Sequence, residues 1–357
     1  MIKNFLFITI CAFFFGYCQC NLEEKTTDKT ILVVGGAGYI GSYVNEMLYK
    51  AGYQTIVLDN LSTGCVESIL HGIFIEGDIA DRDLLDWIFK NYSIDAVMHF
   101  AALKNVGESV KDPLKYYKNN VVYTLNLIEI MIKHHVNVFI FSSSASVFGL
   151  PSEGYVTENC ETNPINPYGQ TKLIVEKVLQ DLGRAYGLRY SILRYFNAAG
   201  GDPEGKIKNH LKYEKNLIPI VLNSLLDPNG EVEIFGTDYD TPDGTCLRDY
   251  IHIHDLGSAH ILAMEQLFQG NMLSSCYNLG NEKAISVQEV IAAVERVTGR
   301  KVNIKVAPRR VGDPAQLIAS AEKAKLELGW IPKYVYFDEM VEHAWIALGE
   351  EVMRNNY

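Results

Sequence analysis

A short apolar segment that runs directly into a glycine-rich loop limits what this chain can fold into. Residues 31–34 are apolar enough for a buried strand, and Gly35, Gly38 and Gly41 follow in a G-x-x-G-x-x-G pattern. From Ile40 onwards, apolar side chains recur at helical spacing. A strand, a glycine loop and a helix N-terminus in this order form a pyrophosphate site, because free backbone N–H groups face the anion.

An acidic residue after the next apolar run indicates which dinucleotide this site binds. Residues 55–58 form that run, and Asp59 ends it, 24 residues after Gly35. A carboxylate here can accept hydrogen bonds from two ribose hydroxyls and would repel the 2′-phosphate of NADP. The sequence therefore predicts NAD as the cofactor.

Short apolar runs alternate with amphipathic stretches from Thr30 to about Phe196. This alternation is typical of an α/β fold in which a doubly wound parallel sheet carries helices on both faces. We predict strands over 31–34, 55–58, 73–75, 96–100, 138–142 and 190–194, and helices over 81–91, 113–134 and 168–186.

The pattern changes after residue 200, where glycine and proline become more frequent and the alternation ends. We therefore expect a leader and linker over 1–29, a Rossmann-type dinucleotide-binding domain over 30–198, and a smaller, irregular lobe over 199–350 that mainly binds substrate.

The ends of the predicted strands carry further candidate residues. Ligands of a doubly wound sheet bind beyond the carboxyl ends of its strands. After the third to sixth strands the chain has Asp78, Ile79, Phe100, Ala101, Ala102, Lys104, Ser144, Phe196 and Asn197.

Tyr168 and Lys172 form a candidate catalytic pair. Side chains four residues apart on a helix lie on the same face, and an ammonium group beside a phenol favours the phenolate. A tyrosine in that state can take a proton from a sugar or alcohol hydroxyl near neutral pH. The pair is a common pattern by itself, but here it accompanies the glycine loop and an upstream Ser144.

Composition and charge exclude other classes of protein. The chain has 357 residues, 48% of them hydrophobic, and a net charge of −11 without a long basic run, so we expect no nucleic-acid partner. None of the seven cysteines forms a Cys-x-x-Cys pair, and His252 and His254 lack an evident third ligand. We therefore expect no metal site.

Motifs spread over nearly all of residues 30–350 resemble the extended short-chain dehydrogenase/reductases. The glycine loop, the triple serine that ends at Ser144 and the segments 58–62 and 99–104 carry this resemblance. Within that family, the members that epimerise UDP-hexoses at C4 are similar at 106–109, 141–145, 167–169, 193–197, 248–252, 277–280 and 308–313.

The resemblance implies a reaction and a set of roles. Tyr168 would take the proton of the sugar 4-hydroxyl while C4 passes its hydride to bound NAD, Ser144 would hydrogen-bond the same oxygen, and Lys172 would hold the nicotinamide ribose. The 4-keto sugar would turn over and take the hydride back on its opposite face. The implied NAD-binding residues are Gly35, Gly38, Tyr39, Ile40, Gly41, Asp59, Asn60, Asp78, Ile79, Phe100, Ala101, Ala102, Lys104, Asn119, Tyr168, Lys172 and Phe196.

The resemblance also implies a UDP-sugar site. Arg248 and Arg310 match arginines on the diphosphate, where a planar guanidinium can donate two bonds. Asp313 matches a carboxylate on the uridine ribose, and Leu317 stands where some members have a tyrosine that closes the sugar pocket. N-acetylated UDP-hexoses are therefore the alternative substrates. The full set is Lys104, Ser144, Tyr168, Asn197, Asn216, Leu217, Arg248, Arg310, Asp313 and Leu317, and the implied assembly is a homodimer through 112–134 and 167–186.

Three other functions compete on this fold. Related dehydratases carry Asp-Glu, and related decarboxylases a Glu at the second position, where this chain has Ala145 and Ser146. Neither side chain can serve as the added acid or base. A non-enzymatic NAD sensor would keep the glycine loop without needing Ser144, Tyr168 and Lys172 together.

The first 20 residues have the plan of a secretory signal peptide. Lys3 precedes an apolar run over 5–18, and small residues at 18 and 20 could form a cleavage site. The run is shorter than the about 20 apolar residues that a membrane-spanning helix usually needs. NAD and nucleotide sugars are cytosolic metabolites, so either the leader is real or the coding start is placed too early. We expect a cytoplasmic protein with no membrane partner.

Overall fold

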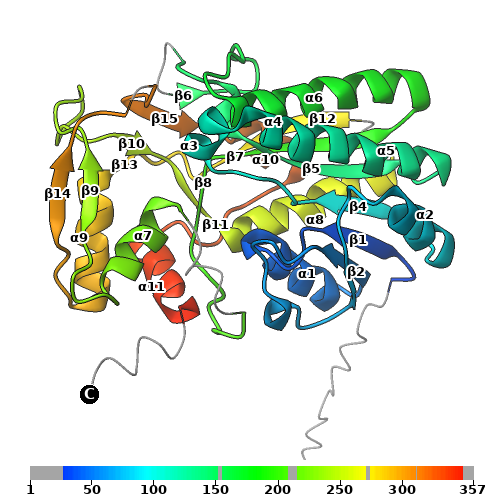
Figure 1. Ribbon diagram of the computed structural model, residues 1–357, viewed down its shortest axis with the longest axis horizontal. Coiled ribbons are helices and arrows are strands. Elements are labelled where there is room, and N and C mark those ends of the chain that lie inside the picture. The colour runs from blue at the N-terminus through cyan, green and yellow to red at the C-terminus, as the bar shows by residue number, and fades with distance from the viewer. Residues whose placement is uncertain (1–26, 152–154, 208–214, 271–273, 311, 349–357) are drawn as a thin grey trace, which may run out of the picture.

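Seven parallel strands form the central sheet of the computed structural model, in the order β12-β7-β5-β4-β1-β2-β3 (Figure 1). The structure describes residues 27–151, 155–207, 215–270, 274–310 and 312–348, so the leader expected over 1–20 lies outside it. The strands are β1 (Thr30–Val34), β2 (Gln54–Asp59), β3 (Ile73–Glu76), β4 (Ala96–His99), β5 (Val138–Ser144), β7 (Arg189–Tyr195) and β12 (Ser274–Leu279). The sheet is buried because apolar side chains point from both of its faces, as in β1, where 31–34 are at most 1% exposed.

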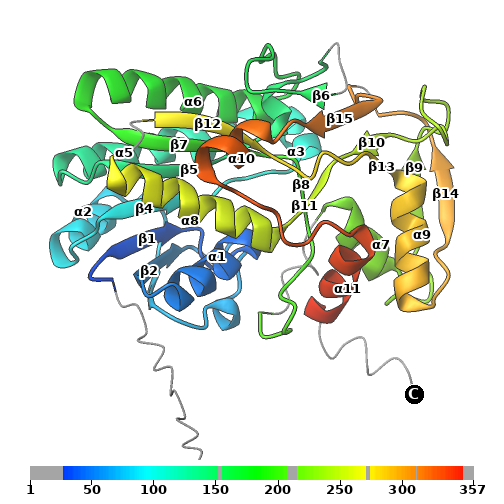
Figure 2. The ribbon, with the colours of Figure 1, turned by 180° about the vertical axis from the view of Figure 1, so that it is seen from behind.

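Helices cover both faces of this sheet. On one face α1 (Tyr39–Lys50) and α8 (Ile253–Gln269) pack against the strands, and on the other α2 (Arg82–Asn91), α5 (Tyr123–Lys133) and α6 (Pro167–Tyr186) do so (Figure 2). The six predicted strands and the helices over 81–91 and 168–186 are present. The predicted α/β class with a doubly wound parallel sheet is confirmed.

The helix expected over 113–134 differs from the prediction. It consists of α4 (Pro113–Tyr117), a π-helical segment (Lys118–Val122) and α5. Asp112 caps α4 by accepting a hydrogen bond from the Lys115 N–H, and nothing in the apolar spacing marks the extra residue of the π turn. Such turns are often found at functional sites.

A seventh strand and a helix join the sheet from the carboxyl-terminal part of the chain, which the sequence analysis did not predict. β12 pairs with β7 in parallel, and α8 packs against α1 and the sheet. The division at residue 198 stays a prediction about where substrate is bound. Residues that follow this boundary nonetheless return to the central sheet, where they form α8 and β12.

Most of the remaining elements lie on one side of the sheet, where several of them form a second core (Figure 1). In contrast, α10 (Glu322–Leu328) packs on α8 and β12. β9 pairs with β14, β8 with β11, and a four-stranded sheet has the order β13-β10-β15-β6. No described helix is long and apolar enough to cross a membrane. The bounds of these elements are α3 (Val106–Lys111), β6 (Tyr155–Val156), β8 (Asn197–Ala199), α7 (Leu217–Ser224), β9 (Val232–Phe235), β10 (Leu247–Arg248), β11 (Tyr250–His252), β13 (Ile285–Ser286), α9 (Val287–Thr298), β14 (Ile304–Ala307), β15 (Gln316–Ala319), α10 (Glu322–Leu328) and α11 (Phe337–Ala347).

Candidate active site

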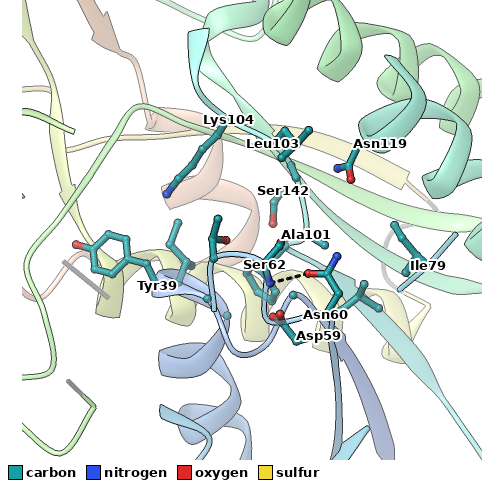
Figure 3. A pocket seen from close by; sticks show the side chains of 18 of the residues that line it. Tyr39, Asp59, Asn60, Ser62, Ile79, Ala101, Leu103, Lys104, Asn119 and Ser142 are labelled. Atoms are coloured by element: carbon teal, nitrogen blue, oxygen red, sulfur yellow. Dashed lines mark hydrogen bonds between the residues drawn. The ribbon is translucent and has the colours of Figure 1, made fainter. Parts of the chain in front are cut away.

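A pocket opens at the carboxyl ends of β1, β2, β3, β4 and β5, where the sequence predicted a ligand site (Figure 3). The glycine loop forms one wall, and Tyr168 and Lys172 of α6 reach it from another element. Of the predicted cofactor residues only Phe196 does not line it. Those that do are Gly35, Gly38, Tyr39, Ile40, Gly41, Asp59, Asn60, Asp78, Ile79, Phe100, Ala101, Ala102, Lys104, Asn119, Tyr168 and Lys172.

The glycine loop has no space for side chains at two of its glycines. Gly35 adopts a φ of +79°, and a Cβ atom there would lie 2.5 Å from the Ala101 backbone nitrogen. A Cβ atom at Gly41 would lie 2.2 Å from the Gly35 carbonyl oxygen. The loop therefore packs backbone against backbone ahead of α1, and the first residues of that helix line the pocket, where a helix N-terminus favours a bound phosphate.

We expect Gly41→Ala to weaken dinucleotide binding strongly, because the added methyl group must displace the backbone of Gly35. Overpacking of this kind costs about 1–3 kcal/mol of folding free energy. The measurements are the cofactor content of the purified protein and its thermal unfolding. Gly107→Ala is the matched control, since a Cβ atom there meets nothing closer than 3.5 Å. Full cofactor content in Gly41→Ala would contradict this assignment.

Asp59, at the end of β2, is buried and already tied to the loop. Its carboxylate accepts hydrogen bonds from the N–H groups of Ala37 at 2.9 Å and Leu61 at 2.8 Å. Burial raises the pKa of Asp59, and the two N–H groups oppose that shift by stabilising the charged form. Each oxygen retains a second lone pair. The carboxylate is thus held in place with capacity for two ribose hydroxyls, which fits the prediction of NAD.

Asn60 and Asp78 extend the same end of the pocket. The Asn60 side-chain amide donates to Asp78 Oδ2 at 2.7 Å, and Asn60 Oδ1 accepts from the Ser62 N–H at 3.0 Å (Figure 3). Tyr39 and Lys104 lie together on another side, with the Lys104 ammonium 6.0 Å from the centre of the Tyr39 ring.

The π-helical segment connects the pocket wall to α6. Asn120 accepts from the Leu103 N–H at 2.9 Å and donates to the Leu103 carbonyl at 2.8 Å, while its amide also reaches Thr171 Oγ1 at 3.1 Å. Asn119 donates to Asn120 Oδ1 and lines the pocket. The segment thereby fixes the chain after β4 relative to the helix that carries Tyr168 and Lys172.

Tyr168 and Ser144 come together from α6 and the end of β5. Tyr168 is the second residue of α6, which Asn166 caps by accepting from the Gly169 N–H at 2.8 Å. Burial raises the pKa of Tyr168, and a hydrogen bond with Ser144 opposes this rise. Ser144 Oγ in turn accepts from the Ser146 N–H at 3.2 Å. The expected lowering of the Tyr168 pKa by Lys172 is not seen in the chain alone.

Lys172 is buried, with 4% of its surface exposed, and its ammonium donates to the Ser142 carbonyl at 2.7 Å. Burial lowers the pKa of Lys172 to about 7, and the negative charge of Glu176 opposes this shift. The ammonium lies 5.9 Å from the centre of the Tyr168 ring. Lys172 is thus close to Tyr168 and able to change charge near neutral pH.

Tyr195 and Ser142 are among the pocket residues that the sequence analysis missed. Tyr195 and Ser142 both line the pocket, and their hydroxyl oxygens lie 2.6 Å apart. Tyr195 also contacts His260 of α8, which is buried and whose Nδ1 lies 2.7 Å from the Leu256 carbonyl. Tyr195 is the last residue of β7 and pairs with Ser144. The rule that ligands bind at strand ends would have found it.

Most of the residues predicted to bind substrate form a second group, which does not line this pocket. Arg248 of β10 donates to Asp313 Oδ1 at 2.9 Å and is the register partner of Leu317 in β15. Leu317 packs on a small core with Phe196, Leu173 and Phe148. The amide of Asn197 donates to the Asp249 carbonyl at 3.0 Å.

Three more predicted substrate residues lie farther into the lobe. The Arg310 guanidinium lies 3.8 Å from the centre of the Phe235 ring. Asn216 is the N-cap of α7, and Leu217 is its first residue. Lys104 and Tyr168 line the first pocket, and Ser144 hydrogen-bonds Tyr168 without lining it, so the structure places the predicted substrate residues in more than one neighbourhood. Their contacts with substrate stay predictions.

The histidines singled out in the sequence belong to a packed cluster. His252 is buried, with Nδ1 accepting from the His254 N–H and Nε2 lying 3.2 Å from His343 Nδ1. Burial lowers the pKa of His254 to about 4. No group of three metal-ligating side chains is found among the described residues.

Comparison with known proteins shows which family shares these features. The model of the NAD dependent epimerase/dehydratase family matches residues 31–280. UDP-glucose 4-epimerase of Halalkalibacterium halodurans is 52% identical over 315 residues, which cover 88% of this chain and 94% of that protein.

Solved structures agree with this relationship. The crystal structure of UDP-glucose 4-epimerase from Brucella ovis in complex with NAD aligns with a TM-score of 0.87 and 43% identity, over 90% of this chain and 98% of that one. The enzyme from Bifidobacterium longum in complex with NAD+ and UDP aligns with a TM-score of 0.83 and 37% identity, over 92% of this chain and 99% of that one.

Proposed function

We propose that this chain, which belongs to the NAD-dependent epimerase/dehydratase family, is a UDP-glucose 4-epimerase. It interconverts UDP-glucose and UDP-galactose by inverting C4 of the sugar. The observation that carries this function is the convergence of Ser144, Tyr168 and Lys172 beside a dinucleotide pocket, in a chain 52% identical to a UDP-glucose 4-epimerase.

The pocket residues fit NAD. The glycine loop would present backbone N–H groups to the pyrophosphate, and Asp59 would hold a ribose, while Asp78 and Ile79 line the pocket on the same side as Asp59 and Asn60. When bound, NAD supplies the acceptor and donor of hydride at its nicotinamide. Lys172, beside Tyr168 and Ser142, is the residue placed to bind the nicotinamide ribose.

The chain's own residues handle the proton. The Tyr168 oxygen takes the proton of the sugar 4-hydroxyl, and Ser144, which hydrogen-bonds Tyr168, steadies the same oxygen. The positive charge of Lys172 favours the phenolate form that this step requires. The same groups return the proton after the 4-keto sugar has turned over, so the net reaction is an inversion without oxidation.

The direct test is to incubate the purified protein with UDP-galactose without adding NAD. We expect UDP-glucose to form until the two sugars reach equilibrium, because the cofactor is regenerated in every turnover. A dependence on added NAD in stoichiometric amounts, with accumulation of a keto sugar, would show a dehydrogenase instead.

The sugar range is set by Leu317 in this proposal. Leu317 is smaller than tyrosine and lies beside Arg248 and Phe196. We expect measurable but secondary turnover of UDP-N-acetylglucosamine, and Leu317→Tyr to abolish it while retaining UDP-galactose turnover. Leu317→Met, which conserves volume, is the control. Equal loss of both activities in Leu317→Tyr would show that the size of the side chain at position 317 does not set the sugar range.

Assembly and location are also proposals. Apolar side chains of the region expected to form a dimer are exposed, with Leu114 80% and Val122 49% accessible, which supports a homodimer through α4 to α6. Sedimentation equilibrium measures whether the protein is a dimer in solution.

We place the enzyme in the cytoplasm, where NAD and nucleotide sugars are available. Mass spectrometry of the mature amino terminus tests whether a leader is removed.

A further inference from the structure

A buried ion pair lies directly behind the proposed catalytic residues. The Glu176 side chain is 1% exposed and the Arg194 side chain 8% exposed. Arg194 donates from Nε to Glu176 Oε1 at 3.0 Å and from Nη2 to Oε2 at 2.7 Å, so the pair is bidentate. Nothing in the proposed reaction uses either residue. An ion pair this far from water needs a reason, because burial of both charges is costly.

Glu176 also ties α6 to the end of β5. The Ser143 hydroxyl donates to Glu176 Oε1 at 2.5 Å. One helical turn earlier, the Lys172 ammonium donates to the carbonyl of the preceding residue, Ser142. Two consecutive residues of β5 are therefore held by two charged residues of α6, and the next residue of the strand is Ser144.

The charges in this region do not cancel. Lys172 and Arg194 are both cationic, and Glu176 is the acidic side chain bonded between α6 and β7. Residues four apart on a helix are neighbours, so the Glu176 carboxylate is close enough to stabilise the Lys172 ammonium. In a buried site this interaction is screened far less than at the surface.

We propose that Glu176 is a positioning residue of the active site, which holds α6 against the end of β5 and offsets the positive charge of Lys172, with Arg194 limiting how much of that negative charge Lys172 feels. The inference rests on the proposed function only for the part that Lys172 plays in the reaction. The charge coupling itself is a property of the folded chain.

Few other charged or titratable groups face Lys172. His99 of β4 is buried, and burial together with the Lys172 charge lowers its pKa to about 3, so it is neutral in the working range. Tyr168 lies on the same helix and Tyr195 at the end of β7, and burial raises the pKa of both. Burial and a hydrogen bond to Glu108 raise the pKa of Tyr116 of α4, which lies near Tyr168. Glu176 is therefore the main anionic influence on Lys172.

The test compares variants that change the charge in opposite directions. Glu176→Gln keeps an acceptor for Ser143 but leaves Arg194 as a second cation near Lys172. Arg194→Met leaves the Glu176 carboxylate without its partner. We expect the pKa of Lys172 to fall in Glu176→Gln and to rise in Arg194→Met. Each change should be about one unit, which is the usual size for a nearby charge. The double variant should return close to the wild-type value.

The pKa is read from the 13Cε chemical shift of Lys172 in the full-length, cofactor-loaded protein grown with labelled lysine. The signal is assigned by its absence in Lys172→Met. This readout needs no turnover, so failure of the proposed epimerase activity would leave it intact. Ser143→Ala is the matched control, because it removes the bond between β5 and α6 without changing charge.

Opposite shifts in the two single variants, with little change in Ser143→Ala, are the expected result. Shifts of the same sign, or none, would overturn the coupling. If Glu176→Gln fails to fold, Arg194→Met and the charge-balanced double variant still decide the question. The double variant must then fold and leave Lys172 unshifted, while Arg194→Met alone raises its pKa. A purely structural role would not give shifts that depend on the sign of the charge removed.

Discussion

Tyr168→Phe should lose at least about a hundredfold in kcat, because general acid–base groups contribute roughly 10²–10⁴-fold in rate. Phenylalanine keeps the packing of the ring at the start of α6 and removes the only oxygen that both lines the pocket from that helix and bonds to Ser144. The variant should therefore fold and retain bound NAD. kcat at saturating UDP-galactose, the NAD released on denaturation and the thermal unfolding midpoint are the measurements.

Tyr277→Phe is the matched control for this variant. Tyr277 is fully buried in β12, its hydroxyl donates to Glu327 at 3.0 Å, and it does not line the pocket. It should lose some stability and no catalytic rate. Near-normal turnover by Tyr168→Phe with NAD bound would remove Tyr168 from the mechanism.

Lys172→Met should lose about tenfold to a thousandfold in kcat near pH 7, since an opposite charge within about 4–6 Å shifts a pKa by 1–3 units. Burial already raises the pKa of Tyr168, and the variant lacks the cation that favours the phenolate. The deficit should shrink as the pH rises towards the pKa of the tyrosine, so kcat of the variant keeps increasing on the alkaline side. The measurement is kcat as a function of pH.

Lys323→Met is a close control for the lysine variant. Lys323 also donates to a backbone carbonyl, that of Cys276 at 3.0 Å, and its ammonium lies 5.1 Å from the centre of the Tyr277 ring. Lys323 makes the same two kinds of contact as Lys172, but it is only half-buried and does not line the pocket. If kcat of Lys172→Met depends on pH in the same way as kcat of the wild type, the phenolate form of Tyr168 does not depend on the charge of Lys172.

Six strands of the central sheet could be predicted because their signals are local. At least three apolar residues mark each of these strands, and Gly35, Asp59 and Asp78 follow three of the strand ends where ligands bind. The glycine loop, Asp59 and the Tyr168–Lys172 spacing each depend on the backbone geometry of a single short stretch of sequence. The pocket accordingly brings these residues together.

The remaining features depend on contacts between distant segments. β12 reaches the sheet edge after a lobe of irregular connections, and its sequence 274–279 has no more than two consecutive apolar residues, which is too few to mark a buried strand. The π turn at Lys118–Val122 is stabilised by Asn120 reaching Leu103 and Thr171, 17 and 51 residues away. The sequence around Asn120 does not indicate that it contacts Leu103 or Thr171.

Charge states were the least predictable from sequence. The spacing of Tyr168 and Lys172 suggests a lowered tyrosine pKa, yet the pKa of Tyr168 rises because its burial outweighs other effects. Lys172 is instead the group whose pKa moves towards neutrality. Desolvation depends on what packs around α6, which includes Arg194 of the neighbouring strand β7, paired with the buried Glu176 of α6 itself.

The fate of the hydrogen at C4 tests the account most directly. Purified protein in ordinary water is given UDP-galactose that carries deuterium at C4, and the UDP-glucose formed is examined by mass spectrometry and NMR. If the hydride leaves and returns within one closed site, the product keeps its deuterium at C4 with the configuration inverted. Replacement of the deuterium by hydrogen from water, or the absence of any UDP-glucose, would contradict the proposed function.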